Sequence, residues 1–145
     1  MIYRTTFIAL SLLLQSCIDD INLQPIVPYH LLHANSCKVW VLEGVYQNGK
    51  NLTSPLDEEK KVFLFYDDNS LYIQKRILLG SKNAEKGFFN LVIPKEQKDT
   101  LLMFYFEPNE KISFKINYLD YRVMKLSRIS SDEIWQFIVL PKPFL

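Results

Sequence analysis

The chain has 145 residues, a length that suits one domain with a short extension. Hydrophobic residues make up 48% and charged residues 23%, a balance typical of a globular rather than a disordered chain. The net charge of +1 leaves no concentrated basic face for phosphate groups, so we expect no nucleic acid among its partners.

The N-terminus has the features of an export signal. Arg4 lies in a short first segment, and the apolar run from Thr5 to Leu14 is too short to span a bilayer. The sequence Leu14-Gln15-Ser16-Cys17 then resembles the lipobox of bacterial lipoproteins. The resemblance implies a signal peptide over residues 1–16 and a lipid on the Cys17 thiol that anchors the chain to the outer membrane. The alternatives are an ordinary secretory signal with a chance cysteine, and an uncleaved N-terminal helix.

The segment after Cys17 is predicted to be a lipidated N-terminus and tether, residues 17–37. Asp19 and Asp20 resemble the export signal of bacteria that display lipoproteins on the outer leaflet, which implies surface exposure; a periplasmic location is the alternative. Pro25 and Pro28 disfavour helix, so we expect an extended or irregular chain here.

This tether contains both histidines and the second cysteine. His30 and His33 would share a helical face and could approach a metal together, but a site needs three or four ligands and the chain has no further histidine. We therefore expect solvated histidines and no metal. If Cys17 carries lipid, Cys37 is either a free thiol or part of an intermolecular disulfide.

From Lys38 onward the pattern is one of short strands and polar turns. Asn48-Gly49 is a strong hairpin signal because both residues tolerate positive φ. The stretch from Gly80 to Gly87 is polar and is predicted to be a loop or a brief helix. The strands are expected at residues 38–46, 61–66, 71–75, 88–93, 100–106, 112–119, 122–127 and 133–140.

We predict an all-β domain over residues 38–145, a single antiparallel up-and-down barrel or closed meander of about eight strands. Trp40 early on the first strand and the Asn48-Gly49-Lys50 turn resemble the start of small bacterial lipocalin-like lipoproteins. The run Val62-Phe-Leu-Phe-Tyr66, its Asp-Asn turn and the returning Leu71-Tyr72 are similar to a hairpin of that family. The resemblance implies an eight-stranded lipocalin-like barrel.

The inward positions of these strands are predicted to be bulky. An eight-stranded barrel is just wide enough to be filled by side chains or to hold one small ligand. We favour a filled aromatic lumen, and a cavity for a small apolar ligand is the alternative. The candidates that line the lumen, beside Phe63 or Leu64, are Trp40, Phe89, Phe104, Phe114, Tyr118, Trp135 and Phe137.

The strand from Thr100 to Phe106 is apolar on both faces. Leu101, Met103 and Tyr105 point one way, and the residues between them point the other way. A barrel strand needs only its inner face to be apolar, so we expect a helix, the tether or another protein to cover the outer face.

No catalytic residue, cofactor or metal is predicted. Both histidines lie in the tether, which excludes a Ser-His-Asp arrangement inside the domain. The acidic groups Asp57-Glu58-Glu59 and Asp67-Asp68 lie in predicted turns, where a solvated charge is the ordinary state. The sequence therefore favours a non-enzymatic envelope lipoprotein that binds a partner protein or a small apolar ligand. The alternative is an envelope enzyme with a carboxylate pair on the barrel rim.

Overall fold

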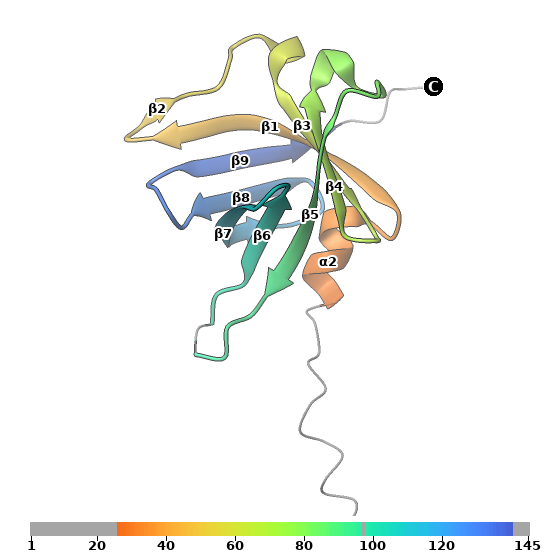
Figure 1. Ribbon diagram of the computed structural model, residues 1–145. Helices are drawn as coiled ribbons and strands as arrows, with labels where there is room; N and C mark the ends of the chain where they lie inside the picture. The colour runs from red at the N-terminus through yellow and green to blue at the C-terminus, as the bar shows by residue number, and fades with distance from the viewer. Residues whose placement is uncertain (1–25, 97, 141–145) are drawn as a thin grey trace, which may run out of the picture.

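The computed structural model describes residues 26–96 and 98–140. A helix, α2 (Ile26–His33), precedes a series of antiparallel strands (Figure 1). Two short 3-10 turns, η1 (Asp57–Glu59) and η2 (Arg76–Leu78), lie between strands. The strands are β1 (Cys37–Gln47), β2 (Lys50–Asn51), β3 (Lys61–Tyr66), β4 (Ser70–Lys75), β5 (Glu85–Val92), β6 (Leu101–Phe106), β7 (Glu110–Leu119), β8 (Val123–Arg128) and β9 (Ile134–Val139).

Eight of these strands form a closed antiparallel barrel. β1 pairs with β3 on one side and with β9 on the other, which closes the sheet. Trp40 lies opposite Val139, and Val45 lies opposite Trp135, so the two tryptophan-bearing strands are neighbours. The two-residue β2 is an extra strand on the end of β1. The predicted fold class is confirmed.

Turn chemistry explains the hairpin that joins β1 to β2. Asn48 and Gly49 have φ values of 50° and 75°, the left-handed conformation that a two-residue hairpin turn requires. Gln47 then pairs with Lys50 and Tyr46 with Asn51. The Asn48-Gly49 hairpin prediction is confirmed.

Strand β5 starts earlier than the sequence suggested. Residues 85–87 were expected in a loop, but they pair with β4 through Ile73↔Glu85 and Leu71↔Gly87. Gly87 is buried, and a Cβ there would lie 2.4 Å from the carbonyl oxygen of Tyr105. This polar segment is therefore a strand and not a loop: Glu85 shares the face of Ile73, Lys86 is exposed, and Gly87 allows one close backbone approach.

The prediction of an irregular tether over residues 26–33 is wrong, because this segment is α2. Pro28 is the third residue of the helix, in the first turn, where a missing N–H breaks no intrahelical hydrogen bond. Tyr29 and Leu32 are buried in the barrel core, so tertiary packing stabilises this short helix.

Helix α2 closes one end of the barrel. β4 stops pairing with β5 at Ser70↔Phe88, which leaves the following part of β5 without that neighbour. The hydroxyl of Tyr29 accepts a hydrogen bond from the backbone N–H of Leu91 at 3.0 Å and donates to Oδ1 of Asn90 at 2.5 Å. The helix thus supplies partners for polar groups that the end of β4 leaves unpaired.

Aromatic rings pack against one another across the lumen. Five of the predicted inward residues, Trp40, Phe89, Phe104, Phe114 and Phe137, are buried, together with Phe63 and Phe65. The ring centroids of Phe65 and Phe89 lie 4.9 Å apart, those of Phe63 and Phe137 5.0 Å, and those of Phe104 and Phe114 5.3 Å. Such tilted and edge-to-face contacts are the favourable arrangements for aromatic pairs.

Tyr118 does not belong to the lumen, and its assignment as an inward residue is wrong. The register of β7 against β8 shifts between Ile116 and Tyr118, so the alternation of faces is interrupted at Asn117. Tyr118 is 50% exposed and donates its hydroxyl to Asp120 at 2.7 Å. Leu119 packs against the core in its place.

The outer face of β6 is only half-buried. Leu102, Phe104 and Phe106 are buried in the barrel, as expected, whereas Leu101, Met103 and Tyr105 remain partly open. Within residues 26–96 and 98–140, no segment fully covers the outer face of β6. The helix α2, which could have covered it, packs into the end of the barrel instead.

Candidate functional site: the open mouth of the barrel

The barrel is open at the end opposite α2, where β1 ends and β3 begins. A pocket of about 320 Å³ lies there, with the apolar side chains of Leu42, Val45 and Trp135 as its floor. The connection between β2 and β3 forms one wall. Its remaining lining residues are Leu52, Thr53, Ser54, Glu59, Lys60, Lys61, Arg128 and Glu133.

A second hollow of about 130 Å³ adjoins the first. Both are lined by Lys61 and Trp135, and the second adds the carboxylates of Glu85 and Glu110. Trp135 and Lys61 therefore border both hollows.

Trp135 is half-buried and fixed by both its ring and its N–H. Its ring centroid lies 4.9 Å from that of Phe114, at the top of the stacked lumen residues. Its Nε1 donates to Oε2 of Glu133 at 3.0 Å, and Arg128 pairs with the same oxygen at 3.2 Å. These two donors hold the pKa of Glu133 below its usual value. The buried Nε of Arg128 has no hydrogen-bond partner among the described residues.

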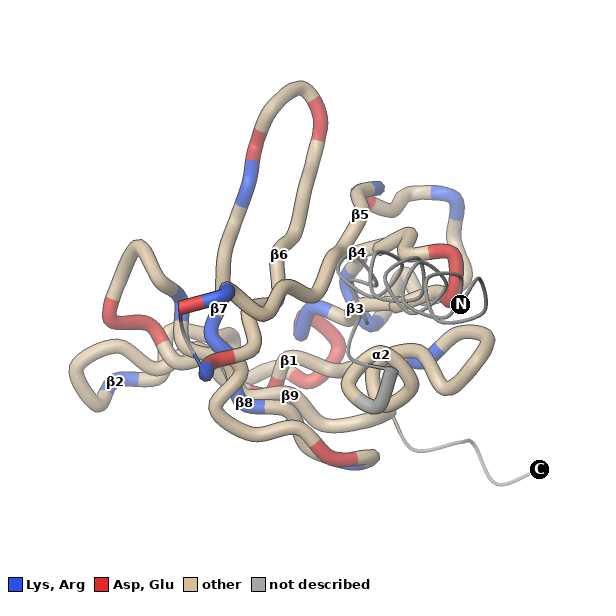
Figure 2. The backbone as a smooth tube through the Cα atoms, turned by 90° about the horizontal axis from the view of Figure 1, so that it is seen from below, with Lys and Arg blue, Asp and Glu red and all other residues tan. Residues whose placement is uncertain are grey.

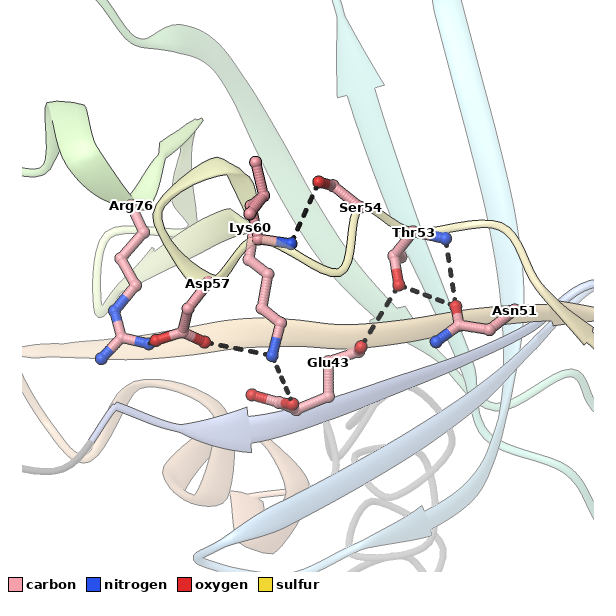
Figure 3. A network of polar contacts seen from close by, with 8 residues as sticks. Glu43, Asn51, Thr53, Ser54, Asp57, Lys60 and Arg76 are labelled. Carbon is pink, nitrogen blue, oxygen red and sulfur yellow. Dashed lines mark hydrogen bonds and ion pairs between the residues drawn. The ribbon is translucent and has the colours of Figure 1, made fainter.

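A polar network holds the wall between β2 and β3 in place (Figure 3). Lys60 Nζ lies 2.8 Å from Glu43 Oε2 and 3.1 Å from Asp57 Oδ1, and Asp57 also pairs with Arg76. The hydrogen bonds to Glu43 and Asp57 raise the pKa of Lys60, and the bond to Lys60 in turn lowers the pKa of Asp57. The network joins this wall to β1 through Glu43 and to η2, which follows β4, through Arg76.

Short-range hydrogen bonds shape the same wall. Thr53 Oγ1 donates to Oδ1 of Asn51 at 2.7 Å and lies 3.3 Å from the backbone carbonyl oxygen of Glu43. Ser54 Oγ donates to Glu59 at 2.8 Å and accepts from the N–H of Leu56 at 3.2 Å. The wall of the pocket is thus fixed without help from regular strand pairing.

The charges of the rim are not all neutralised. Lys60 and Glu133 are engaged as above, whereas Lys61 has no ion pair within the described parts of the chain. The first hollow therefore combines an apolar floor with three basic side chains, Lys60, Lys61 and Arg128, against the two carboxylates of Glu59 and Glu133. This arrangement suits a small ligand with an apolar part and a negative group.

The predicted site residues fall into four groups. Cys17 lies outside the described residues. Trp40, Phe89, Phe104, Phe114 and Phe137 form the packed interior, Tyr118 lies outside the barrel, and of the predicted lumen residues Trp135 lines the mouth. Sequence reasoning missed Lys61, Arg128 and the wall of residues 52–54. Arg128 and Glu133 flank a predicted turn before Trp135, a signal that was present but weak.

The histidines and Cys37 lie at the closed end, away from the mouth. Nδ1 of His30 is 2.8 Å from Oδ1 of Asn35, and Nδ1 of His33 accepts from the N–H of Asn35 at 3.0 Å. Cys37 is a free, half-buried thiol whose pKa is raised by burial. Among the described residues there is no group of three or more His, Cys, Asp or Glu side chains placed to hold a metal ion.

The acidic turns considered as catalytic pairs are exposed, and one aspartate in each, Asp57 and Asp68, has a lowered pKa. Lys60 lowers the pKa of Asp57, and hydrogen bonds from Ser70 lower the pKa of Asp68. A general acid at neutral pH needs a raised pKa, so neither shift has the direction that such a role demands.

No helix in the described part of the chain is long and apolar enough to cross a membrane. No protein-family model, no curated protein and no solved structure matches the chain. The geometry of the barrel therefore carries the functional argument.

Proposed function

We propose that the chain is a non-enzymatic, lipocalin-like lipoprotein of the cell envelope, anchored to the outer membrane through Cys17, whose barrel binds a small ligand at its open mouth. The anchor and the location are supported by the lipobox-like sequence around Cys17. The ligand site is supported by the mouth itself.

A single structural observation supports the ligand proposal: the barrel is closed at one end and open at the other. At the closed end α2 packs Tyr29 and Leu32 into the core, whereas at the open end a pocket of about 320 Å³ lies over Leu42, Val45 and Trp135. This volume is at the lower limit of small-molecule sites. Because aromatic rings occupy the interior, the ligand lies over the lumen rather than deep within it.

The two tryptophans provide a direct test. Trp135 lines the mouth, whereas Trp40 is fully buried beside α2, so each variant with one tryptophan reports on one end of the barrel. The unlipidated Cys17→Ala chain would be titrated with bromohexanoate, a short carboxylate whose bromine quenches indole fluorescence on contact. We expect saturable quenching in the Trp40→Phe variant and little quenching in the Trp135→Phe variant.

A rim variant tests the role of charge. Lys61→Gln should raise the bromohexanoate concentration that gives half-maximal quenching several-fold. Lys82 is exposed and lies outside the mouth, so Lys82→Gln should leave this concentration unchanged. Equal quenching of both single-tryptophan variants, or quenching without saturation, would argue against a site at the mouth.

A further inference from the structure

A further hollow lies on the outer barrel wall, outside the mouth. Its volume is about 720 Å³, and three aromatic side chains on neighbouring strands form its floor: Tyr72 on β4, Phe88 on β5 and Tyr105 on β6. Phe88 lies directly opposite Tyr105 in the sheet, and Tyr72 lies opposite Lys86. Phe88 is 60% exposed. Clustered apolar rings that are open to solvent mark an interaction surface.

Charges of opposite sign occupy different parts of this groove. The ammonium groups of Lys86 and Lys111 lie over the floor, 5.7 Å from the ring centroid of Tyr72 and 5.9 Å from that of Tyr105. Carboxylates line the edges: Asp68 comes from the β3–β4 turn, and Glu107 and Glu110 flank the turn between β6 and β7.

Most of these charged groups have no ion-pair partner among the described residues. Asp68 accepts hydrogen bonds from Ser70, but Lys86, Lys111, Glu107 and Glu110 form no ion pair within residues 26–96 and 98–140. Elsewhere on the barrel, acidic and basic residues are interspersed (Figure 2). In the groove the basic groups lie over the floor and the acidic groups line the edges.

We propose that this groove is the surface through which two copies of the chain associate, with the acidic β6–β7 turn of each copy lying over the aromatic, lysine-bearing floor of the other. In a two-fold interface the same patch meets itself, so it must carry both charges in complementary places. The groove meets this requirement, whereas a partner of one charge would face like charges on part of it. Pro108 and Phe88 provide the apolar contact, the lysines lie over the floor beside it, and the carboxylates form the rim.

The proposal is tested on the full chain. Two copies with different C-terminal affinity tags are expressed together, the membranes are solubilised, one tag is captured, and the recovery of the other is measured. We expect co-recovery for the unaltered chain and a loss of roughly tenfold or more for Phe88→Ser, because a central aromatic residue dominates such interfaces. Ile77→Ser is the matched control, since Ile77 is 65% exposed but lies outside the groove.

Charge inversion makes the test independent of folding effects. Lys86→Glu/Lys111→Glu and Glu107→Lys/Glu110→Lys should each lose co-recovery when expressed as the sole form, because like charges then meet. Expressed together, the two double variants should recover each other. Background recovery for the unaltered chain overturns the proposal and leaves the groove to a foreign partner or a sugar. Recovery that is insensitive to Phe88→Ser, or two inverted variants that fail to restore each other, overturns it as well.

Discussion

The indole N–H of Trp40 donates to the backbone carbonyl of Leu32 at 3.0 Å, and this bond joins the first barrel strand to the helix that closes the barrel. Both side chains are fully buried. One residue therefore contributes to the packed lumen and to the position of α2.

Replacing Trp40 should cost a large part of the stability of the domain. Trp40→Ala leaves a cavity and should lower the free energy of unfolding by about 3–5 kcal/mol. Trp40→Phe keeps a ring but leaves the Leu32 carbonyl without its partner, for which we expect about 1–3 kcal/mol. Urea denaturation measures both values, and an unchanged midpoint for Trp40→Ala would show that this residue is not part of the core.

The hydroxyl of Tyr29 should protect the end of β5 that does not pair with β4 from hydrogen exchange. Tyr29→Phe removes the acceptor for the Leu91 amide and should destabilise the chain by about 1–3 kcal/mol. Hydrogen exchange at the Leu91 amide should accelerate more than at the Phe104 amide, which lies inside a paired strand. Equal changes at the two amides would mean that α2 does not close this end.

The two aromatic residues of β7 should respond very differently to truncation. Phe114 is fully buried, so Phe114→Ala should cost about 3–5 kcal/mol. Tyr118 points outward beyond the register shift, so Tyr118→Ala should cost less than about 1 kcal/mol. The comparison of their melting temperatures checks the register directly, and a larger loss for Tyr118→Ala would contradict it.

Acid should weaken the barrel partly through Glu133. Its pKa is lowered in the folded state by Trp135 and Arg128, so the ionised form stabilises the fold. This stability is fully present above the unfolded pKa of about 4.3 and is lost as the pH falls through the lower folded value. Glu133→Gln should therefore lower the melting temperature at pH 7 and lose less on acidification below pH ~4.3. Asp132→Asn, in the same turn, is the control, and identical pH profiles for Glu133→Gln and the unaltered chain would refute the assignment.

The anchor prediction concerns Cys17. Cys17→Ala should abolish incorporation of labelled fatty acid and release the chain from membranes, because the lipid on this thiol is the proposed anchor. Fractionation after a high-salt wash measures the release, with Cys37→Ala as the matched control. A Cys17→Ala chain that stays in the membrane fraction would contradict the lipobox interpretation.

The strands of the barrel were predictable because their signal is local. The alternation of apolar and polar residues along β7 from Ile112 to Ile116 reports directly which face is buried, and Asn48-Gly49 determines its turn. Tyr118 was misplaced because a shift in strand register depends on the partner strand, which has no signature in β7 itself. The choice between Phe63 and Leu64 likewise needed the partner strand, and the structure places Phe63 inside.

The helix and the mouth were harder for different reasons. α2 is short and contains Pro28, so it is stabilised by the burial of Tyr29 and Leu32 rather than by its own propensity. The pocket wall depends on contacts such as that of Lys60 with Glu43, between residues far apart in the sequence. No period in the sequence encodes such contacts, so the candidate site became visible only in three dimensions.

The capping helix also gives the molecule an orientation. β1 runs from the end closed by α2 to the open mouth, and the chain enters the fold at Ile26, beside the closed end (Figure 1). Fully extended, the stretch from Cys17 to Ile26 spans at most about 30 Å. An anchor at Cys17 thus keeps the closed end near the bilayer and leaves the mouth directed toward the aqueous phase. A molecule that reaches Trp135 would then arrive from the water side, already dissolved, rather than by lateral diffusion out of the lipid.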